Sequence, residues 1–361
     1  MEIIYFLTIG SWAFGLLVGL YRWLGMSTVL EASPEVPTIA VLIPVRNELK
    51  NLPALLEDLA HQTKFPSEVW ILDDHSTDGL VDWLAVHQKS FPFQLHLWTS
   101  DRPENSFLSP KKYALSHLVP ILSAEWILTL DGDCRVNSRW VETMATAMKN
   151  AHFVAGPISF ITNRSLFSKC QVVELASLQF TAAVTLSSGQ PTMCSAANMG
   201  FRRALFPGYA DNLTIASGDD EFLMHAYHAL YPGKVVWVKS PEALVQTHPQ
   251  SSFSSFFHQR KRWASKWNRY QSWTPTLLAI WVFFVNLVTI GCLVTGNLGP
   301  VWLRWSVEFL VLSAFLGYFK QIKFIWLIPL VQLVYPFYVV IFGILAQKKS
   351  TYEWKGRKWA S

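Results

Sequence analysis

Charged residues are scarce in this chain. They make up 15% of its 361 residues, whereas 51% are hydrophobic and 17 are tryptophan. A soluble globular protein carries a charge on about a quarter of its residues, so the deficit argues against an ordinary soluble protein and predicts membrane-embedded segments. The chain is long enough for one sizeable globular domain together with several helices in lipid.

Cysteine motifs and phosphate-binding loops of the P-loop type are also missing. The four cysteines are widely scattered and show no zinc-binding spacing, which is typical of free thiols in a reducing compartment. No glycine-rich loop ending in Lys-Ser or Lys-Thr occurs, which excludes a P-loop nucleotide site. Internal repeats and low-complexity tracts do not occur either.

Acidic residues are lacking between Glu242 and Glu308, where basic residues crowd positions 260–269. A second basic cluster occupies positions 348–358. Each cluster adjoins an apolar segment, so we expect a membrane surface or a phosphorylated ligand as the partner and no nucleic acid.

The first apolar segment covers residues 3–21. The basic n-region of a secretory signal is lacking because the only early charge is Glu2, so residues 1–24 are predicted to form an uncleaved membrane anchor. Arg22 then places the C-terminal end of the anchor in the cytoplasm.

A C-terminal membrane region is predicted over residues 276–347, with two or three segments. The candidates are residues 277–296, 301–319 and 324–346, of which the second is weakened by Arg304 and Glu308. Three crossings would put the basic tail at 348–361 outside, against the positive-inside rule. We therefore expect a cytoplasmic tail, with one of the last two segments lying in the interface or re-entering.

Short apolar strands alternate with amphipathic stretches between these membrane regions. The expected strands are Thr38–Val45, Glu68–Leu72, Phe93–Trp98 and Trp126–Leu130, with a helix at Glu48–Gln62. This alternation predicts an α/β domain over residues 38–250 with a mostly parallel sheet, which binds its ligand at the carboxyl ends of the strands.

Carboxylates follow two of these strands. Asp131 and Asp133, separated by Gly132, end the fourth strand, and such hard oxygen ligands suit Mg²⁺ or Mn²⁺ bound to a diphosphate. Asp73 and Asp74 end the second strand, where an acid accepts hydrogen bonds from a ribose hydroxyl or a base N–H. The alternatives are an Asp-Gly turn after a core strand and a capping role at the start of the next element.

Two later stretches have both a structural and a functional interpretation. Asp219, Asp220 and Glu221 open a predicted helix, where the helix dipole favours acids, although one of them could serve as a catalytic base. Residues 251–275 mix aromatic and basic residues, which is typical of an amphipathic helix at a membrane interface. Cations of this segment could also contact a diphosphate.

These motifs, taken in order, resemble those of membrane-integrated glycosyltransferases of family 2. That family includes ceramide glucosyltransferases and the synthases of cellulose, hyaluronan and poly-N-acetylglucosamine. The similarity runs from about Thr38 to Trp263 and rests on Pro44-Val45-Arg46-Asn47-Glu48, Asp73-Asp74, Asp131-Gly132-Asp133, Gly218-Asp219-Asp220 and Gln259-Arg260-Lys261-Arg262-Trp263. The resemblance implies a GT-A-type nucleotide-sugar-binding domain, with transmembrane and interfacial α-helices around it.

The resemblance also implies roles for individual residues. Asp220 would be the general base, and Asp133 would bind the metal, Mg²⁺ or Mn²⁺. The donor would be bound by Pro44, Asp73, Asp74, Lys111, Lys112, Asp131, Gln259, Arg260, Arg262 and Trp263. The basic tail around Trp354 also resembles the family, whereas the single anchor before the domain departs from several polysaccharide synthases.

The function implied is an inverting hexosyl transfer from a nucleotide-diphospho-sugar to a hydroxyl of a membrane lipid or lipid-linked acceptor. A processive synthase that extends and exports a glycan is the alternative. The enzyme is expected in a bacterial plasma membrane, with its catalytic domain facing the cytoplasm. A non-catalytic transporter is disfavoured because the acids cluster outside the apolar segments.

Overall fold

The computed structural model describes residues 2–29, 37–104, 106–209, 212–215, 217–264, 272–346, 351–354 and 357–360. The chain divides into two compact units. The sheet unit comprises residues 27–161 and 193–248, and the helical unit comprises residues 1–26, 162–192 and 249–361.

The main sheet of the sheet unit contains strands β1 (Ile39–Val45), β2 (Glu68–Asp73), β3 (Gln94–Thr99), β4 (Trp126–Thr129), β6 (Phe153–Ala155), β8 (Met199–Arg202) and β9 (Val235–Trp237). Their order is β3-β2-β1-β4-β8-β6-β9. The pairs among β1 to β4 are parallel, as is β6 with β9, while β8 runs antiparallel to β4 and β6. The predicted mostly parallel sheet is confirmed.

A smaller sheet joins β5 (Arg135–Val136), β10 (Val245–Thr247) and β7 (Ile158–Phe160) in that order. The α-helices of the sheet unit are α2 (Leu52–Ala60), α3 (Leu80–His87), α4 (Pro110–Leu118), α5 (Trp140–Met148) and α7 (Glu221–Leu230). Short 3₁₀ turns are η1 (Gln88–Ser90), η2 (Val119–Ile121), η3 (Ala196–Asn198), η4 (Arg203–Leu205) and η6 (Pro241–Ala243).

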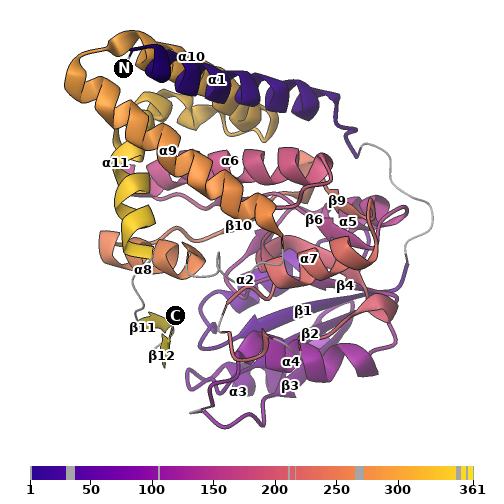
Figure 1. The fold of residues 1–361 in the computed structure, drawn as a ribbon. Coiled ribbons are helices and arrows are strands. Elements are labelled where there is room, and N and C mark those ends of the chain that lie inside the picture. The colour runs from indigo at the N-terminus through magenta and orange to yellow at the C-terminus, as the bar shows by residue number, and fades with distance from the viewer. Residues whose placement is uncertain are drawn as a thin grey trace. The chain divides into compact units, whose positions relative to one another are not determined.

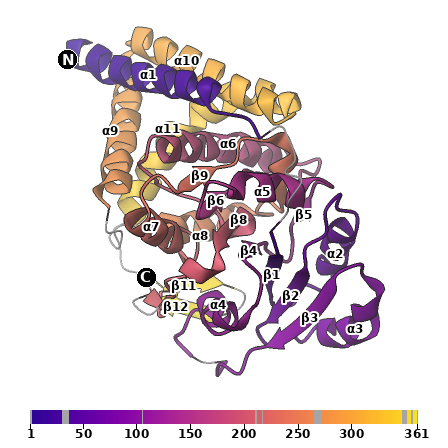
Figure 2. The same cartoon turned by 90° about the vertical axis from the view of Figure 1, so that its right-hand side faces the viewer.

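The core of the sheet unit follows from the two residue periodicities. Alternate residues of β1, namely Ile39, Val41 and Ile43, face the same side and are buried in one apolar cluster. Leu52, Leu55, Leu56 and Leu59 of α2, at helical spacing, bury their side chains in that cluster. Figure 2 shows α2 and α3 beside β1, β2 and β3. This packing fixes the strands whose ends carry the acids.

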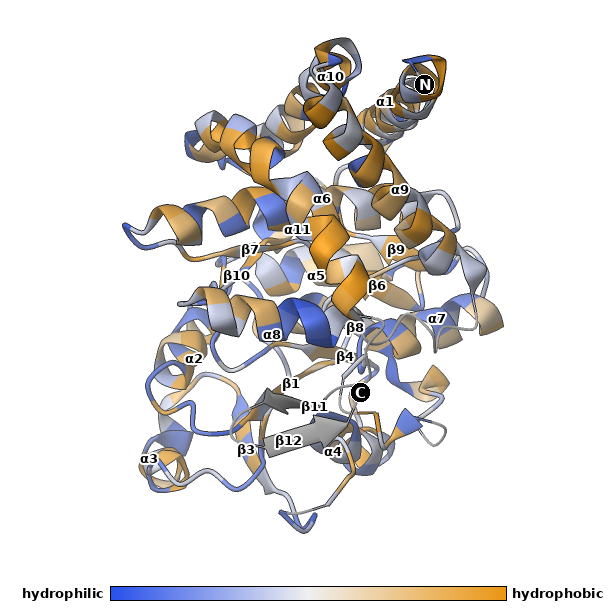
Figure 3. Cartoon of the chain, turned by 60° about the vertical axis from the view of Figure 1, so that its left-hand side comes forward, coloured by the Kyte–Doolittle hydropathy of each residue, from blue (hydrophilic) through white to orange (hydrophobic). Residues whose placement is uncertain are grey.

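The helical unit contains α1 (Glu2–Gly25), α6 (Leu166–Ser187), α8 (Phe253–Ala264), α9 (Trp273–Thr295), α10 (Leu298–Tyr318), η8 (Ile322–Leu327) and α11 (Ile328–Ala346). A hairpin of β11 (Thr351–Trp354) and β12 (Arg357–Ala360) follows. By length and composition, four described helices could cross a membrane: Glu2–Gly25, Trp273–Thr295, Leu298–Tyr318 and Ile322–Leu345. Apolar residues dominate α9 and α11 in Figure 3.

The N-terminal helix lies beside α10 and runs parallel to it (Figure 1). Trp12 donates its indole N–H to Glu308 at 3.1 Å. About three turns further along α1 and two turns further along α10, the Trp23 ring lies 4.9 Å from that of Phe315. The predicted anchor is therefore packed along its length against a later helix of the same unit.

Helix α6 lies within the predicted 38–250 domain, yet its contacts group it with the helical unit. Phe180 packs on Phe315 of α10 with ring centroids 6.0 Å apart, and Glu174 is ion-paired with Arg260 of α8. The grouping of α6 with the helical unit could not be read from an amphipathic pattern, because three of its polar residues, Gln171, Glu174 and Gln179, are buried.

The charged pair that weakened the third apolar segment is neutralised within the helical unit. Arg304, 2% exposed, donates from Nε to Glu308 at 2.7 Å. Its terminal nitrogens donate to Thr289 Oγ1 at 2.5 Å and Asn286 Oδ1 at 3.0 Å. Because each charge has a partner, helix α10 can lie in an apolar environment despite its two ionisable residues.

We expect Arg304→Met to destabilise the protein strongly, because it leaves Glu308 as an uncompensated charge. Breaking a buried pair on one side costs roughly 3–5 kcal/mol, whereas apolar replacement of both partners is often close to neutral. The melting temperature in detergent should therefore fall for Arg304→Met and recover in Arg304→Met/Glu308→Leu. A single variant as stable as the wild type would contradict this role.

Candidate active site

The acids predicted from the sequence lie at the carboxyl ends of neighbouring strands in the sheet unit. Asp73 ends β2 and is in register with Val45 at the end of β1. Asp131 and Asp133 follow β4, which pairs with β1 on its other side. Parallel strands bring these ends to a single edge of the sheet, which is where such folds bind ligands.

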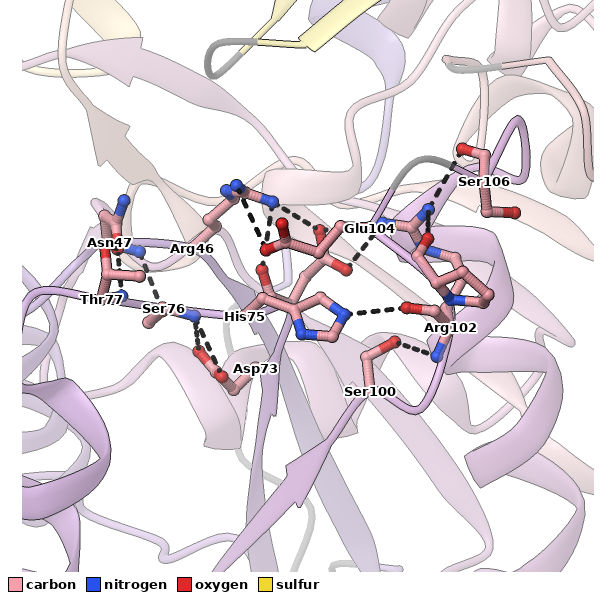
Figure 4. Close-up of polar contacts among 12 residues, drawn as sticks. Arg46, Asn47, Asp73, His75, Ser76, Thr77, Ser100, Arg102, Glu104 and Ser106 are labelled. Carbon is pink, nitrogen blue, oxygen red and sulfur yellow. Dashed lines mark hydrogen bonds and ion pairs between the residues drawn. The ribbon is translucent and has the colours of Figure 1, made fainter.

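Asp74 forms ion pairs with two arginines, Arg46 and Arg102, both of which are labelled in Figure 4. Its carboxylate accepts a hydrogen bond at 2.9 Å from Arg102, whose side chain is fully buried, and pairs with Arg46 at 3.5 Å. Arg102 in turn donates to the carbonyl oxygens of Pro103 and Ser106. Arg102 was not identified from the sequence, because it lies in an irregular loop 28 residues beyond its partner.

Asp73 has a different local role from Asp74. Its two oxygens accept hydrogen bonds from the backbone N–H of Ser76 at 3.3 and 3.2 Å, as the capping alternative expects. The turn is completed by Asn47, whose Oδ1 accepts from the N–H of Thr77 at 2.7 Å. The donor-binding role of Asp73 stays a prediction, as does that of Pro44, which lies in β1 opposite Leu72.

The φ of Gly132 is not positive, so backbone conformation does not require glycine at this position. Glycine is required because a side chain would not fit. A Cβ at this position would lie 2.9 Å from Val45 Cγ1 and 3.2 Å from Glu48 Cγ. The Asp131-Gly132-Asp133 backbone is thus pressed against the end of β1. We expect any larger residue here to displace both carboxylates.

Asp133 lies in a region of acidic and polar groups suited to a cation. Burial, together with the negative charges of Asp131 and Glu48, raises the pKa of the Asp133 carboxyl. The Thr247 hydroxyl donates to this carboxyl, and His248 is the nearby basic group that opposes the shift. The sequence did not single out His248, because the strand that positions it, β10, is only three residues long.

No group of three or more His, Cys, Asp or Glu side chains in the described ranges could hold a metal ion unaided. The carboxylate oxygens of Asp131 and Asp133 nonetheless fit Mg²⁺ or Mn²⁺, provided that a diphosphate supplies further ligands. Such partial coordination by protein is usual for Mg²⁺ at nucleotide sites. The donor set therefore fits the predicted metal.

Lys111 interacts electrostatically with several acids of the site. Its Nζ donates to Asp131. Burial lowers the pKa of Lys111, but the charges of Asp131, Asp219 and Asp220 outweigh that effect and raise it overall. Acids that are about 90 residues apart in sequence thus act electrostatically on one ammonium group.

Lys112, the next residue, has a structural role. Its side chain is fully buried and its Nζ donates to the carbonyl oxygens of Asn212, Ile215 and Ser217, each at 3.0 Å. The Phe222 ring lies 4.8 Å from the ammonium. Lys112 therefore holds the segment that leads into Asp219 and Asp220, while its donor-binding role stays a prediction.

We expect Lys112→Met to lower kcat by about tenfold or more, since buried carbonyls left unsatisfied cost roughly 1–3 kcal/mol each and the acids that follow would shift. Steady-state transfer rates would be compared with those of Lys149→Met, which removes an exposed lysine of the same unit. Equal rates in the two variants would argue against a role for Lys112 in placing the acids.

Asp220 is the N-cap of α7, as the structural alternative expects. One carboxylate oxygen accepts from the N–H of Glu221 at 2.8 Å and the other from the N–H of Ala196 at 3.2 Å. Burial raises the pKa of Asp219, whose backbone carbonyl accepts from the Tyr209 hydroxyl at 2.7 Å. A carboxylate has about four acceptor sites, so capping does not exhaust those of Asp220.

The remaining predicted site residues belong to the helical unit. Gln259, Arg260, Arg262 and Trp263 all lie on α8. The amphipathic helix predicted within residues 251–275 is observed as Phe253–Ala264, and residues 265–271 lie outside the described residues. In the tail, residues 348–350, 355–356 and 361 lie outside the described residues. The sheet unit thus brings together Asp131, Asp133, Lys111, Asp219 and Asp220, with Asp74 at the same sheet edge.

The chain belongs to the glycosyl transferase family group 2, which matches residues 126–340. Residues 40–208 also match glycosyl transferase family 2. The protein is therefore a nucleotide-sugar glycosyltransferase of family 2, and its sheet unit has a GT-A-like fold. A comparison with curated proteins finds no match.

One solved structure supports the fold. A mannosyltransferase from Pyrobaculum calidifontis, PcManGT in complex with GDP-Man and Mn²⁺, matches with a TM-score of 0.56 and 15% identity, over 92% of this chain and 99% of that one. TarS from S. aureus, residues 1–349 in complex with UDP, gives a TM-score of 0.44 and 16% identity, over 90% of this chain and 96% of that one.

Proposed function

We propose that this enzyme transfers a hexose, with inversion, from a nucleotide-diphospho-sugar to a hydroxyl of a membrane lipid or a lipid-linked acceptor. The observation that carries this proposal is the hydrogen bond from Lys111 to Asp131, together with the electrostatic effect of Asp219 and Asp220 on the same ammonium, at the sheet edge that also holds Asp74. Within a family 2 glycosyltransferase, these groups supply a nucleoside contact, a diphosphate contact and a base.

Donor binding is assigned to the sheet edge. Asp74, fixed by Arg102, accepts a hydrogen bond from the base or ribose, and Asp131 with Lys111 lies beside the diphosphate. Asp133 and His248 would hold Mg²⁺ or Mn²⁺, which when bound neutralises charge on the leaving diphosphate. Gln259, Arg262 and Trp263 of α8 are also assigned to donor binding, because their motif resembles that of the family.

Asp220 is assigned as the general base. The backbone N–H groups of Ala196 and Glu221 hold its carboxylate in one orientation, so that an acceptor hydroxyl can donate to a remaining oxygen lone pair. Asp220 removes the proton as the hydroxyl oxygen attacks the anomeric carbon from the face opposite the diphosphate. The single displacement inverts the configuration at that carbon.

A lipid acceptor is supported by the apolar helices and by α8, which carries cations in its last turn. The C-terminal end of α10 is assigned to the cytoplasm, because the turn before this helix is uncharged and lysines follow it. Arg22 favours the same side for the C-terminal end of α1, which runs parallel to α10. Helix α11 ends beside α8, where Phe342 lies 4.8 Å from Phe257 (Figure 1). We therefore assign α11 as re-entrant or interfacial, with the tail in the cytoplasm.

The experiment is a donor panel. Detergent-purified protein is incubated with lipid extract, Mn²⁺ or Mg²⁺ and GDP-mannose, UDP-glucose or UDP-N-acetylglucosamine, and nucleoside diphosphate release and product size are measured. We expect release that depends on added lipid and a product carrying one or a few sugars. A long polymer would favour the processive synthase, and no release with any donor would contradict the proposal.

A further inference from the structure

Arg260 of α8 has every side-chain nitrogen engaged inside the helical unit. Its Nε donates to Glu174 Oε1 of α6 at 2.9 Å, and its two terminal nitrogens donate to Glu174 Oε2 and to Gln259 Oε1. Arg260 is 4% exposed and Glu174 is 7% exposed. A bidentate pair of this kind is among the strongest side-chain contacts that proteins form.

Aromatic rings surround the same guanidinium group. Its carbon lies 4.4 Å from the ring centroid of Phe256 and 4.1 Å from that of Trp263, both on α8. The hydroxyl of Tyr338, on α11, donates to Glu174 Oε1 at 3.4 Å. Three helices, α6, α8 and α11, are therefore joined at one buried ion pair.

These contacts are incompatible with Arg260 acting as a ligand of the donor diphosphate. Moving the guanidinium to a phosphate would leave Glu174 as an unpaired buried carboxylate, which is strongly unfavourable. It would also leave Gln259 Oε1 without this donor and remove the cation from the face of Trp263. Arg260 thus contacts two of the three other residues of the predicted donor-closing motif.

We propose that Arg260 and Glu174 are a positioning pair that fixes the orientation of α8 and, through it, Gln259, Arg262 and Trp263. This replaces the sequence-based assignment of Arg260 as a donor ligand. The inference rests on the proposed function for what the motif does, but the ion pair itself can be tested without activity. Gln259 is held through its Oε1 and Trp263 through its ring face.

The test compares Glu174→Gln, Arg260→Gln and the double variant, with Lys261→Gln as the control that removes a neighbouring cation from the same helix. We expect both single variants to lower kcat by similar factors, up to about 10²-fold as for misplaced site residues, with smaller changes in donor KM. The double variant should be no worse than either single one. Arg260→Lys should recover little, because an ammonium cannot form the bidentate contact.

Amide hydrogen exchange of residues 253–264 supplies the readout that does not depend on activity. We expect faster exchange there in both single variants and unchanged exchange in Lys261→Gln. The inference is overturned if Arg260→Gln weakens binding of nucleoside diphosphate while Glu174→Gln does not, or if exchange in α8 stays at the wild-type rate. A wild-type protein inactive with every donor would refute the proposed function and leave the exchange result to decide the ion pair.

Discussion

Asp220→Asn should abolish sugar transfer while the protein still binds its donor. The amide cannot accept the proton of the acceptor hydroxyl, and loss of a general base typically lowers kcat by about 10²–10⁴-fold. The amide keeps one oxygen for the N–H of Glu221 or Ala196, so most of the N-cap survives. Transfer would be measured by product formation, and donor binding by calorimetry with the nucleoside diphosphate.

The control for this prediction is Glu221→Gln, which removes the adjacent negative charge from the same helix turn. It should retain most of the transfer rate, because Glu221 has no assigned part in the chemistry. If Asp220→Asn retained most activity, Asp220 would be only a helix cap, which is the interpretation that its two backbone hydrogen bonds support on their own. Equal losses in both variants would indicate a general effect of charge.

The second large effect is expected from Asp133→Ala. We expect the variant to lose the metal-dependent part of donor binding and nearly all transfer, because the leaving diphosphate is no longer neutralised. Titration of Mn²⁺ in the presence of nucleoside diphosphate would measure the change directly. The expected shift is at least about tenfold in metal affinity, on the scale of losing a ligand or its support.

Asp82→Ala is a suitable comparison for this experiment. Asp82 is an exposed carboxylate of the same unit, in the first turn of α3. Its loss should leave Mn²⁺ affinity at the wild-type value. Unchanged metal affinity in Asp133→Ala would remove Asp133 from the metal site, and a further test of His248→Ala would then show whether any protein group contributes.

The sequence predicted the sheet well, because its strands are continuous apolar runs that end abruptly in polar residues. β1, β2 and β4 begin and end within one residue of the expected bounds. The shared edge of Asp73 and Asp131 follows from parallel pairing alone. The strands and the sheet edge that they share could therefore be predicted from the residue pattern and the parallel topology.

The hydrogen-bond and ion-pair partners of these residues could not be predicted from the sequence. Arg102 reaches Asp74 across 28 positions and Glu174 reaches Arg260 across 86, and neither separation has a periodicity that sequence analysis can use. Lys111 and Lys112 look equivalent in the sequence, but adjacent helix positions point about 100° apart, so one meets the acids and the other meets three carbonyls. Buried polar contacts of this kind are set by tertiary packing.

The parallel packing of α1 on α10 has a practical consequence for handling the enzyme. Trp12 is a hydrogen-bond donor to Glu308, and Trp23 lies among aromatic rings of α10 and the residues after it. A truncation that removes the first 25 residues to improve solubility would thus delete the helix that packs against α10. Chimeras with a foreign leader helix would need to reproduce both tryptophans in the correct register.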